Sequence, residues 1–475
     1  MAAEKQFGFD TLAVHAGQRP DPVTGARAVP VYQTSAYVFE DTDHAANLFA
    51  LQRFGNIYSR IMNPTVAVFE ERVAALENGI GAVATASGQA AQHLTIFTLM
   101  QAGDQFVSSR SLYGGTFQQF DVSFRKMGID CRFVDVDNLG QWQAAVTDRT
   151  KAFYVETIGN PQIDVADIQA LAELAHKVGV PLVVDNTFAS PYLCRPLEWG
   201  ADIVVHSATK FICGHGTAIG GVIVDGGRFP WDNGRFPGMT EPSKDYHNLR
   251  FFEYFGDIGW LMKCRAEMLR DYGATMAPQT AWLMLQGLET LHLRMERHCA
   301  NGARIAQWLA AHPAVTYVNY PGLTASPYAT LAKKYLAKGA GAILTFGIKG
   351  GREAGKQFIE SVQIFSHLAN VGDAKSLVIH PGSTTHQQLT DDELRAAGIG
   401  PDMIRVSVGI EDADDLIWDL DQALTRSQRP QPMAVRNGLG HSILSTAFGA
   451  PYHGAGAALS DNKRSEMELS KEETA

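Results

Sequence analysis

The sequence has few cysteines, and their arrangement argues against a disulfide framework or a zinc site. The five cysteines are odd in number, widely spaced and include no Cys-x-x-Cys pair. This usage is typical of a reducing compartment, so we expect a cytoplasmic location and no bound metal. The first residues, MAAEKQFGFD, are charged and contain no apolar run, so no secretion signal is expected there.

Excess positive charge and long apolar runs are also missing. The formal net charge is -10, which argues against nucleic acid or an acidic membrane surface as a partner. The longest apolar runs, such as residues 278–287, are too short and too mixed to cross a bilayer. Charged residues make up only 19% of the chain and hydrophobic residues 45%. This balance predicts a large buried core, which oligomerisation would enlarge further.

From residue 66 onward, strand-like and helix-like patterns alternate. Amphipathic helices are expected between the strands, for example at residues 65–78, 88–101 and 167–179. Alternation of this kind predicts an α/β fold with a doubly wound, mostly parallel sheet. In such sheets, ligands bind beyond the carboxyl ends of the strands. The expected strands are 81–87, 104–109, 131–136, 152–158, 181–187, 201–207 and 218–225.

Four regions are expected along the chain. Residues 1–65 lack regular periodicity and are interpreted as an N-terminal arm, and residues 66–270 as the large domain. Residues 271–428 are expected to form a smaller α+β domain, and the polar segment 429–475 a disordered tail. The aromatic, glycine-rich insert at 225–260 interrupts the alternation, and we interpret it as a lid or entrance wall of a site.

Two charged residues follow neighbouring strands of the predicted sheet. Lys210 comes directly after the apolar run ADIVVHS, where burying an unpaired ammonium group is costly. Asp185 follows the preceding strand, PLVVD, so both side chains are expected at the ligand-binding edge. Taken alone, Lys210 is also compatible with a solvated surface charge, and Asp185 with the cap of a turn.

Hydroxyl and glycine residues at the same edge predict a phosphate site. Ser87, Gly88 and Gln89 end one strand and open a helix, whose N-terminus attracts anions, although this is also an ordinary helix start. Ser207 and Thr209 add two hydroxyls beside the lysine. A lysine, an acid and a phosphate cradle are together what pyridoxal phosphate requires.

Seven short motifs identify the chain as similar to a known family. In order they are YSRIMNPT (58–65), ASGQAA (86–91), LYGGT (112–116), ETIGNP (156–161), DNTFASP (185–191), HSATK (206–210) and IRVSVGIED (404–412). Over residues 8–428 the chain resembles the Cys/Met-metabolism pyridoxal-phosphate enzymes. The resemblance implies the fold of aspartate aminotransferase (fold type I), with a seven-stranded-type, mostly parallel sheet and a smaller C-terminal α+β domain.

The resemblance assigns catalytic roles to several residues. Lys210 would hold the cofactor as a Schiff base and carry protons, which removes the cost of burying its charge. Asp185 would pair with the pyridinium nitrogen, and Tyr113 would stack on the ring and assist proton transfer. Asn160 would contact the ring hydroxyl. The alternatives are a half-buried core tyrosine for Tyr113 and a turn before proline for Asn160.

The resemblance also implies a shared active site and a substrate clamp. Tyr58 and Arg60 would reach the phosphate of the neighbouring subunit, so the active unit would be at least a dimer, with a tetramer usual. Tyr58 would also contact the substrate. Arg405 would bind the substrate α-carboxylate, or alternatively form an ordinary ion pair. The phosphate would be held by Ser87, Gly88, Gln89, Ser207 and Thr209.

Within the family, several features resemble the O-acetylhomoserine sulfhydrylases. They are Lys375 and His380 in NVGDAKSLVIHPGSTTHQQL, the long 225–260 insert, and Gly115 where methionine γ-lyases carry cysteine. Gly382, where alanine is commoner, departs from the pattern. The implied reaction replaces acetate by sulfide or methanethiol, giving homocysteine or methionine.

Other readings stay open. Within the family they are cystathionine γ-synthase, O-succinylhomoserine sulfhydrylase and methionine γ-lyase. A nicotinamide oxidoreductase is suggested by the glycine string GHGTAIGG (214–221), which does not fit GxGxxG. A non-catalytic binding protein on the same fold is the third possibility.

Overall fold

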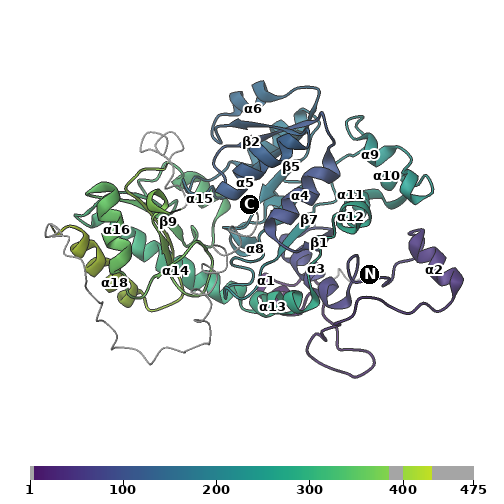
Figure 1. Cartoon of the computed structure of the whole chain (residues 1–475), viewed down its shortest axis with the longest axis horizontal. Coiled ribbons are helices and arrows are strands. Elements are labelled where there is room, and N and C mark those ends of the chain that lie inside the picture. Colours follow the sequence, from purple (N-terminus) through teal and green to yellow (C-terminus); the bar gives the residue numbers. More distant parts are fainter. Residues whose placement is uncertain (1–4, 385–398, 430–475) are drawn as a thin grey trace, which may run out of the picture. The chain divides into compact units, whose positions relative to one another are not determined.

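The computed structural model describes residues 5–384 and 399–429 and has an α/β fold with two sheets (Figure 1). The strands of the larger sheet run parallel, except for β7, which is antiparallel to both of its neighbours. This arrangement confirms the predicted seven-stranded, mostly parallel sheet. Its order is β1 (Gly81–Thr85), β7 (Gly221–Asp225), β6 (Ile203–His206), β5 (Leu182–Asp185), β4 (Thr150–Glu156), β2 (Gln105–Ser109) and β3 (Asp130–Val134).

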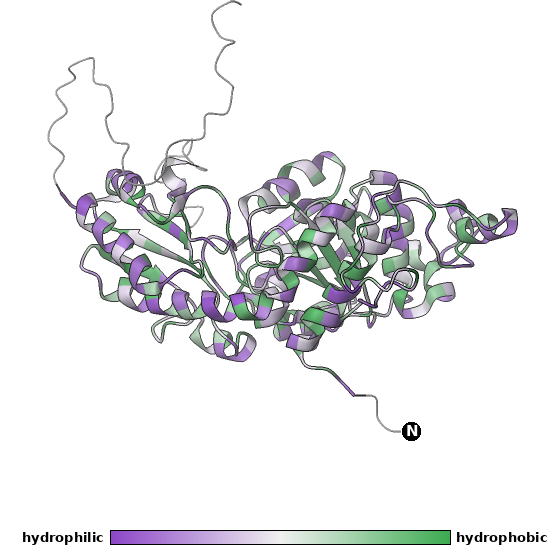
Figure 2. Ribbon diagram, turned by 90° about the horizontal axis from the view of Figure 1, so that it is seen from below, coloured by the Kyte–Doolittle hydropathy of each residue, from purple (hydrophilic) through white to green (hydrophobic). Residues whose placement is uncertain are grey.

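Both faces of the larger sheet are covered, because successive residues of a strand point to opposite sides. Val183 and Ile203 pack in one hydrophobic cluster with helix α4 (Gly88–Leu99). Val184 packs in the other cluster, with helix α3 (Pro64–Glu77). In Figure 2 the central strands are green, hydrophobic segments between helices that alternate green and purple.

Local sequence signals set the ends of the helices beside the sheet. Asn63 caps α3 by accepting hydrogen bonds from the amides of Thr65 and Val66, and Pro64 occupies the first helical turn. Asn78 ends the helix in the left-handed conformation. Other helices of this part are α1 (Phe9–His15), α2 (Thr42–Phe49), α5 (Gly114–Gln118), α6 (Leu139–Ala145), α7 (Ile168–Lys177), α8 (Ser190–Leu193) and α13 (Pro278–Glu289).

A smaller five-stranded sheet follows, as the sequence predicts for this α+β part. It packs with helices α14 (Leu291–Ala311), α16 (Gly351–Ser361) and α18 (Ala413–Ser427). Its order is β10 (Ser366–His367), β11 (Leu377–Ile379), β12 (Met403–Ser407), β9 (Ile343–Ile348) and β8 (Val315–Asn319). Strands β10 and β11 were not predicted, because runs of two or three residues carry no readable periodicity. Apart from Arg429, the predicted tail lies outside the described residues.

The 225–260 insert packs as a small aromatic core beside the larger sheet. Trp231 and Trp260 are buried and stack with their ring centroids 6.0 Å apart, in the same cluster as Val183. The segment forms short helices, including α9 (Pro237–Thr240) and α10 (Phe251–Phe255), which Figure 1 places to one side of the sheet. No residue of the insert lines the cavity around Lys210, so within the single chain the insert is neither a lid nor a wall of that cavity.

The N-terminal segment packs against the rest of the chain at its first helix and leaves apolar side chains exposed further on. Helix α1 packs near α3, whereas several large apolar side chains between residues 31 and 58 are exposed. Among them, Val38 is 98% exposed and Phe54 67%. Within the described residues, no helix combines the length and apolar character needed to cross a membrane.

Candidate active site

A cavity of about 240 Å³ lies beyond the carboxyl ends of the strands and gathers the predicted site. Every residue predicted to bind cofactor or substrate lines it, except Tyr58 and Arg60. The predicted residues in its wall are Ser87, Gly88, Gln89, Tyr113, Asn160, Asp185, Ser207, Thr209, Lys210 and Arg405. Segments more than 300 residues apart in the sequence therefore meet here, as the fold predicts.

Lys210 is partly buried in the cavity wall, and its amine is suited to act as a nucleophile. Its Nζ donates a hydrogen bond to Oδ1 of Asn370 at 2.5 Å, and among the described ion pairs none includes Lys210. Burial, and to a smaller extent the nearby Arg405 cation, together lower the pKa of Lys210 from its ordinary 10.5 to about 8. A substantial fraction of this amine is thus neutral near physiological pH.

Asp185 is 8% exposed and is surrounded by hydrogen-bond donors. Its Oδ2 accepts from Nε2 of Gln92 at 3.1 Å and from the hydroxyl of Tyr154 at 3.3 Å. Its Oδ1 accepts from the amide of Thr187 at 3.0 Å and from the hydroxyl of Thr187 at 2.5 Å. Four donors suit a carboxylate, which is the form needed to pair with a pyridinium nitrogen.

Sequence reasoning did not identify these partners of Asp185. Tyr154 lies on β4 and Gln92 on α4, so both reach Asp185 only through the tertiary fold. The sequence does contain a sign of their position. Tyr154 stands two residues before Glu156, the last residue of its strand, so both side chains lie on one face near the ligand-binding edge. Gln92 follows Gly88 by one helical turn, so it faces the same end of the sheet.

The predicted phosphate cradle is a close contact between the start of α4 and the residues after β6. Ser87 caps α4 by accepting a hydrogen bond from the amide of Ala90 at 3.1 Å. A Cβ atom on Gly88 would lie only 2.7 Å from Cβ of Ser207, so only glycine allows this approach. The hydroxyl of Thr209 donates to the carbonyl of Gly220 at 3.1 Å, so it must rotate to donate to a phosphate.

Tyr113, Asn160 and Arg405 line another side of the cavity. The main-chain amide of Tyr113 donates to Oε1 of Glu156 at 2.7 Å, whereas its side chain is 52% exposed. Arg405, on β12 of the smaller sheet, donates from Nη1 to Oδ1 of Asn160 at 3.2 Å. Burial lowers the pKa of Arg405 to about 10, so it remains a cation at neutral pH. No described ion pair includes Arg405, so the alternative of an ordinary ion pair is not observed.

Gly115 leaves room for the ring of Tyr113. A Cβ atom at this position would lie 2.5 Å from Cε1 of Tyr113 and 2.7 Å from Nε2 of Gln89. Any side chain here would therefore displace the tyrosine. Lys375 is exposed and His380 is buried, with Nε2 of His380 2.9 Å from the carbonyl of Pro401. Neither of these two residues lines the cavity.

Tyr58 and Arg60 do not line the Lys210 cavity of this chain. The guanidinium of Arg60 stands over the ring of Tyr58, 5.6 Å from its centroid, and Arg60 donates to the carbonyl of Arg270. This placement leaves both side chains close together at the surface of the N-terminal segment. Their predicted role at a neighbouring site remains a prediction.

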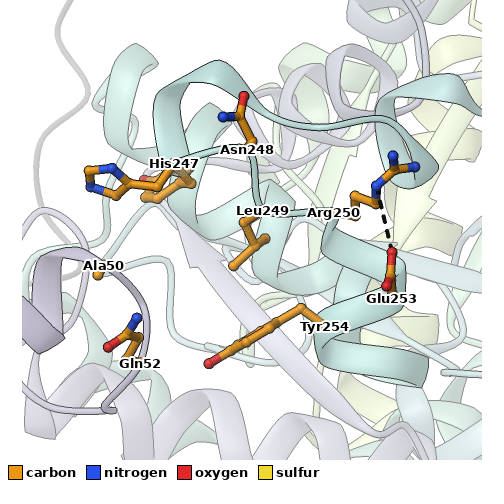
Figure 3. Close-up of a pocket in the computed structure, with 9 residues that line it drawn as sticks. Ala50, Gln52, His247, Asn248, Leu249, Arg250, Glu253 and Tyr254 are labelled. Carbon is orange, nitrogen blue, oxygen red and sulfur yellow. Dashed lines mark ion pairs between the residues drawn. The ribbon is translucent and has the colours of Figure 1, made fainter.

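A second cavity, of about 480 Å³, lies where the insert meets the N-terminal segment (Figure 3). Gln52 faces it from the N-terminal segment, and Tyr254 and Arg250 from the insert. Arg250 is paired with Glu253 across 3.6 Å. The described residues of its wall include no lysine and combine no nucleophile with a phosphate cradle, so the Lys210 cavity is the candidate active site.

The residues of the Lys210 cavity fit pyridoxal phosphate. This cofactor requires an amine nucleophile, an acid and a phosphate turn. No described ion pair includes Lys210, Asp185 is held by four donors, and a single Cβ would fill the turn at Gly88. Glu156 and Asn370 also line the cavity, although the sequence analysis gave neither a role. The donor set thus agrees with the cofactor that the motifs imply.

Comparison with known proteins also indicates a pyridoxal-phosphate enzyme. Residues 10–425 match the family described as Cys/Met metabolism PLP-dependent enzymes. The chain is 54% identical over 429 residues to an O-acetyl-L-homoserine sulfhydrylase of Leptospira meyeri, covering 88% of this chain and 97% of that protein. It is 52% identical over 419 residues to a homocysteine synthase of Schizosaccharomyces pombe, covering 88% and 98%.

A solved structure agrees in fold as well. A crystal structure assigned as an O-acetylhomoserine (thiol)-lyase from Campylobacter jejuni superposes with a TM-score of 0.85 at 40% identity. The match covers 88% of this chain and all of that one, which carries a pyridoxyl-lysine phosphate. Fold, site and sequence agree, and the chain belongs to the Cys/Met-metabolism family of pyridoxal-phosphate-dependent enzymes.

Proposed function

We propose that this chain is an O-acetyl-L-homoserine sulfhydrylase, which converts O-acetyl-L-homoserine and sulfide into homocysteine and acetate. The observation that carries the proposal is the meeting of Lys210 and Arg405 in one cavity. A nucleophilic amine and a cation that belongs to no described ion pair suit a substrate that bears an α-amino and an α-carboxylate group. The relatives named above, at 52–54% identity, support the choice of O-acetylhomoserine.

Different residues of the cavity have different roles in this reaction. Pyridoxal phosphate, when bound, supplies an electron sink for the negative charge that develops at the substrate Cα. Lys210 takes the Cα proton and returns protons later, and its hydrogen bond to Asn370 fixes the position of its amine. Arg405 clamps the α-carboxylate, and Tyr113 assists proton transfer. In the balanced reaction the Cγ–O bond to acetate breaks and a Cγ–S bond to sulfide forms.

The choice of substrates follows from their chemistry. Acetate is a good leaving group, whereas hydroxide from free homoserine is a poor one. Sulfide is small, so the nucleophile needs only a narrow path to Cγ. Methanethiol in place of sulfide would give methionine directly. Gly115, which leaves the Tyr113 ring undisturbed, is consistent with replacement in preference to the elimination of a γ-lyase.

We further propose a homo-oligomer, at least a dimer, in which Tyr58 and Arg60 complete the site of the neighbouring subunit. Support comes from the exposed apolar side chains of the N-terminal segment, such as Phe49 at 60% and Phe54 at 67%. A second copy of the chain would bury these side chains and bring Tyr58 and Arg60 to its cavity. A cytoplasmic location is proposed from the cysteine usage alone.

A substrate panel tests the proposed specificity. Purified, cofactor-loaded protein is assayed with O-acetyl- or O-succinyl-L-homoserine, each combined with sulfide, methanethiol or cysteine. The highest kcat/KM is expected for the acetyl ester with sulfide. A preference for the succinyl ester, or for cysteine as the attacking thiol, would replace the proposed function by O-succinylhomoserine sulfhydrylase or cystathionine γ-synthase.

A further inference from the structure

Glu156 lies in the wall of the cavity with no role in the mechanism described so far. It ends strand β4, directly beside Asp185 at the end of β5, and the two residues are partners in the parallel register. Tyr154, two residues earlier on β4, hydrogen-bonds Asp185, so Glu156 shares that face of the sheet. Glu156 is 7% exposed. Two carboxyl groups thus stand side by side in a nearly dry site.

The Glu156 carboxyl joins the two loops that present Tyr113 and Asn160. Its Oε1 accepts the main-chain amide of Tyr113 at 2.7 Å. The main-chain amide of Asn160 is also directed at this carboxyl. The side chain of Asn160 in turn accepts a hydrogen bond from Arg405 at 3.2 Å. One side chain therefore fixes the backbone of the residue expected to stack on the cofactor ring and of the residue expected at its hydroxyl.

The surroundings of Glu156 favour its neutral form. No described ion pair includes Glu156, whereas the adjacent Asp185 accepts four hydrogen bonds. The titratable groups that act on Glu156 are Asp185 on β5, Asp164 on the following loop and Tyr154 on its own strand. The cations Lys210 and Arg405 line the same cavity, but no described ion pair joins either of them to Glu156. Burial raises the pKa of Glu156 well above its usual range and the Asp185 charge raises it further, and these two causes outweigh the lowering by the amides of Tyr113 and Asn160.

We propose that Glu156 is a neutral carboxylic acid that positions Tyr113 and Asn160 for the cofactor, while Asp185 carries the negative charge of the pair. Glu156 is then a positioning residue that acts through two backbone amides. This division of labour lets one site hold two adjacent carboxyl groups, because only one of them is ionised. The inference rests on the cofactor and is independent of which ester and thiol the enzyme uses.

Matched amide substitutions at the two positions test this assignment. Glu156→Gln keeps the size, the neutrality and an oxygen that accepts from Tyr113, so the Kd for pyridoxal phosphate should change by less than about threefold. Asp185→Asn makes the same chemical change but removes the ionised partner of the ring nitrogen, so its Kd should rise by at least about tenfold. Glu156→Ala leaves the two amides without an acceptor and should raise the Kd about tenfold. The Kd is measured by titrating cofactor-free protein.

Two spectroscopic readouts separate positioning from a purely structural role. The infrared difference spectrum of wild type minus Glu156→Gln should contain the carbonyl band of a protonated carboxyl group. The pH dependence of the absorbance of the bound cofactor should be unchanged in Glu156→Gln and shifted in Asp185→Asn. A carboxylate band, or a pH curve that shifts in Glu156→Gln as in Asp185→Asn, would overturn the proposal. If Glu156→Ala fails to fold, the infrared measurement on Glu156→Gln still decides.

Discussion

The lowered pKa of Lys210 leads to a quantitative prediction about its reactivity. With a pKa of about 8, half of the Lys210 amine in the cofactor-free enzyme is neutral at pH 8. An ordinary lysine, with a pKa of about 10.4, is about 0.4% neutral at that pH. The neutral fraction at Lys210 is therefore larger by about a hundredfold, and only the neutral amine attacks a carbonyl carbon.

The assay is competitive labelling of lysines over a range of pH. Cofactor-free protein is treated briefly with an amine-acylating reagent, and the modified peptides are quantified by mass spectrometry. The labelling of Lys210 should rise to a plateau with a midpoint near pH 8, and exposed Lys375 serves as the reference in the same digest. Since the two sites differ in access, the midpoints are compared and the absolute rates are not.

A variant tests the cause of the shift. Replacing Arg405 by methionine removes the nearby cation, so the Lys210 midpoint should move upward. The movement should be only partial, because burial is the larger cause. A wild-type midpoint near 10 would refute the reasoning, since it would mean that the cavity around Lys210 is as well hydrated as the surface.

Three further predictions concern the cradle, the sheet and the subunit interface. Gly88→Ala should weaken cofactor binding by about tenfold or more in an equilibrium titration, because its Cβ would lie 2.7 Å from Cβ of Ser207. Asp225 has a pKa raised by burial from 3.8 to about 7, so the folded state loses up to about 4 kcal/mol of stability as pH rises from about 4 through 7. Asp225→Asn does not titrate, so urea unfolding should show it gaining stability relative to wild type between about pH 4 and about pH 7, and a constant difference across this range would contradict this. Mixing inactive Lys210→Ala and Arg60→Ala subunits should restore activity if sites are shared between subunits, and no gain over either parent would argue against sharing.

The parts of the site that were predicted lie at strand ends. Lys210 and Asp185 could be placed together because the carboxyl ends of parallel strands meet at one edge, and the sequence marks those ends by a switch from apolar to polar residues. The phosphate turn could be placed for the same reason, since Ser87 and Gly88 carry the signature of a helix start. Long, periodic helices such as α3 were predicted to within a few residues.

The parts that were missed depend on tertiary contacts. Asn370, the hydrogen-bond partner of Lys210, comes from a segment 160 residues away with no strand or helix pattern of its own. Glu156 was read only as part of a motif, because its contact to the amide of Tyr113 joins two separate loops. The aromatic insert was interpreted as a lid or entrance wall, yet Trp231 and Trp260 pack against the sheet and no insert residue lines the Lys210 cavity, since composition alone does not tell which surface an aromatic segment covers.

One measurement tests the central claim most directly. Purified protein with pyridoxal phosphate is incubated with O-acetyl-L-homoserine, with and without sulfide, and homocysteine and α-ketobutyrate are quantified. The account predicts homocysteine that depends on sulfide, and none from Lys210→Ala. Formation of α-ketobutyrate regardless of sulfide would contradict the account and make the protein a γ-lyase.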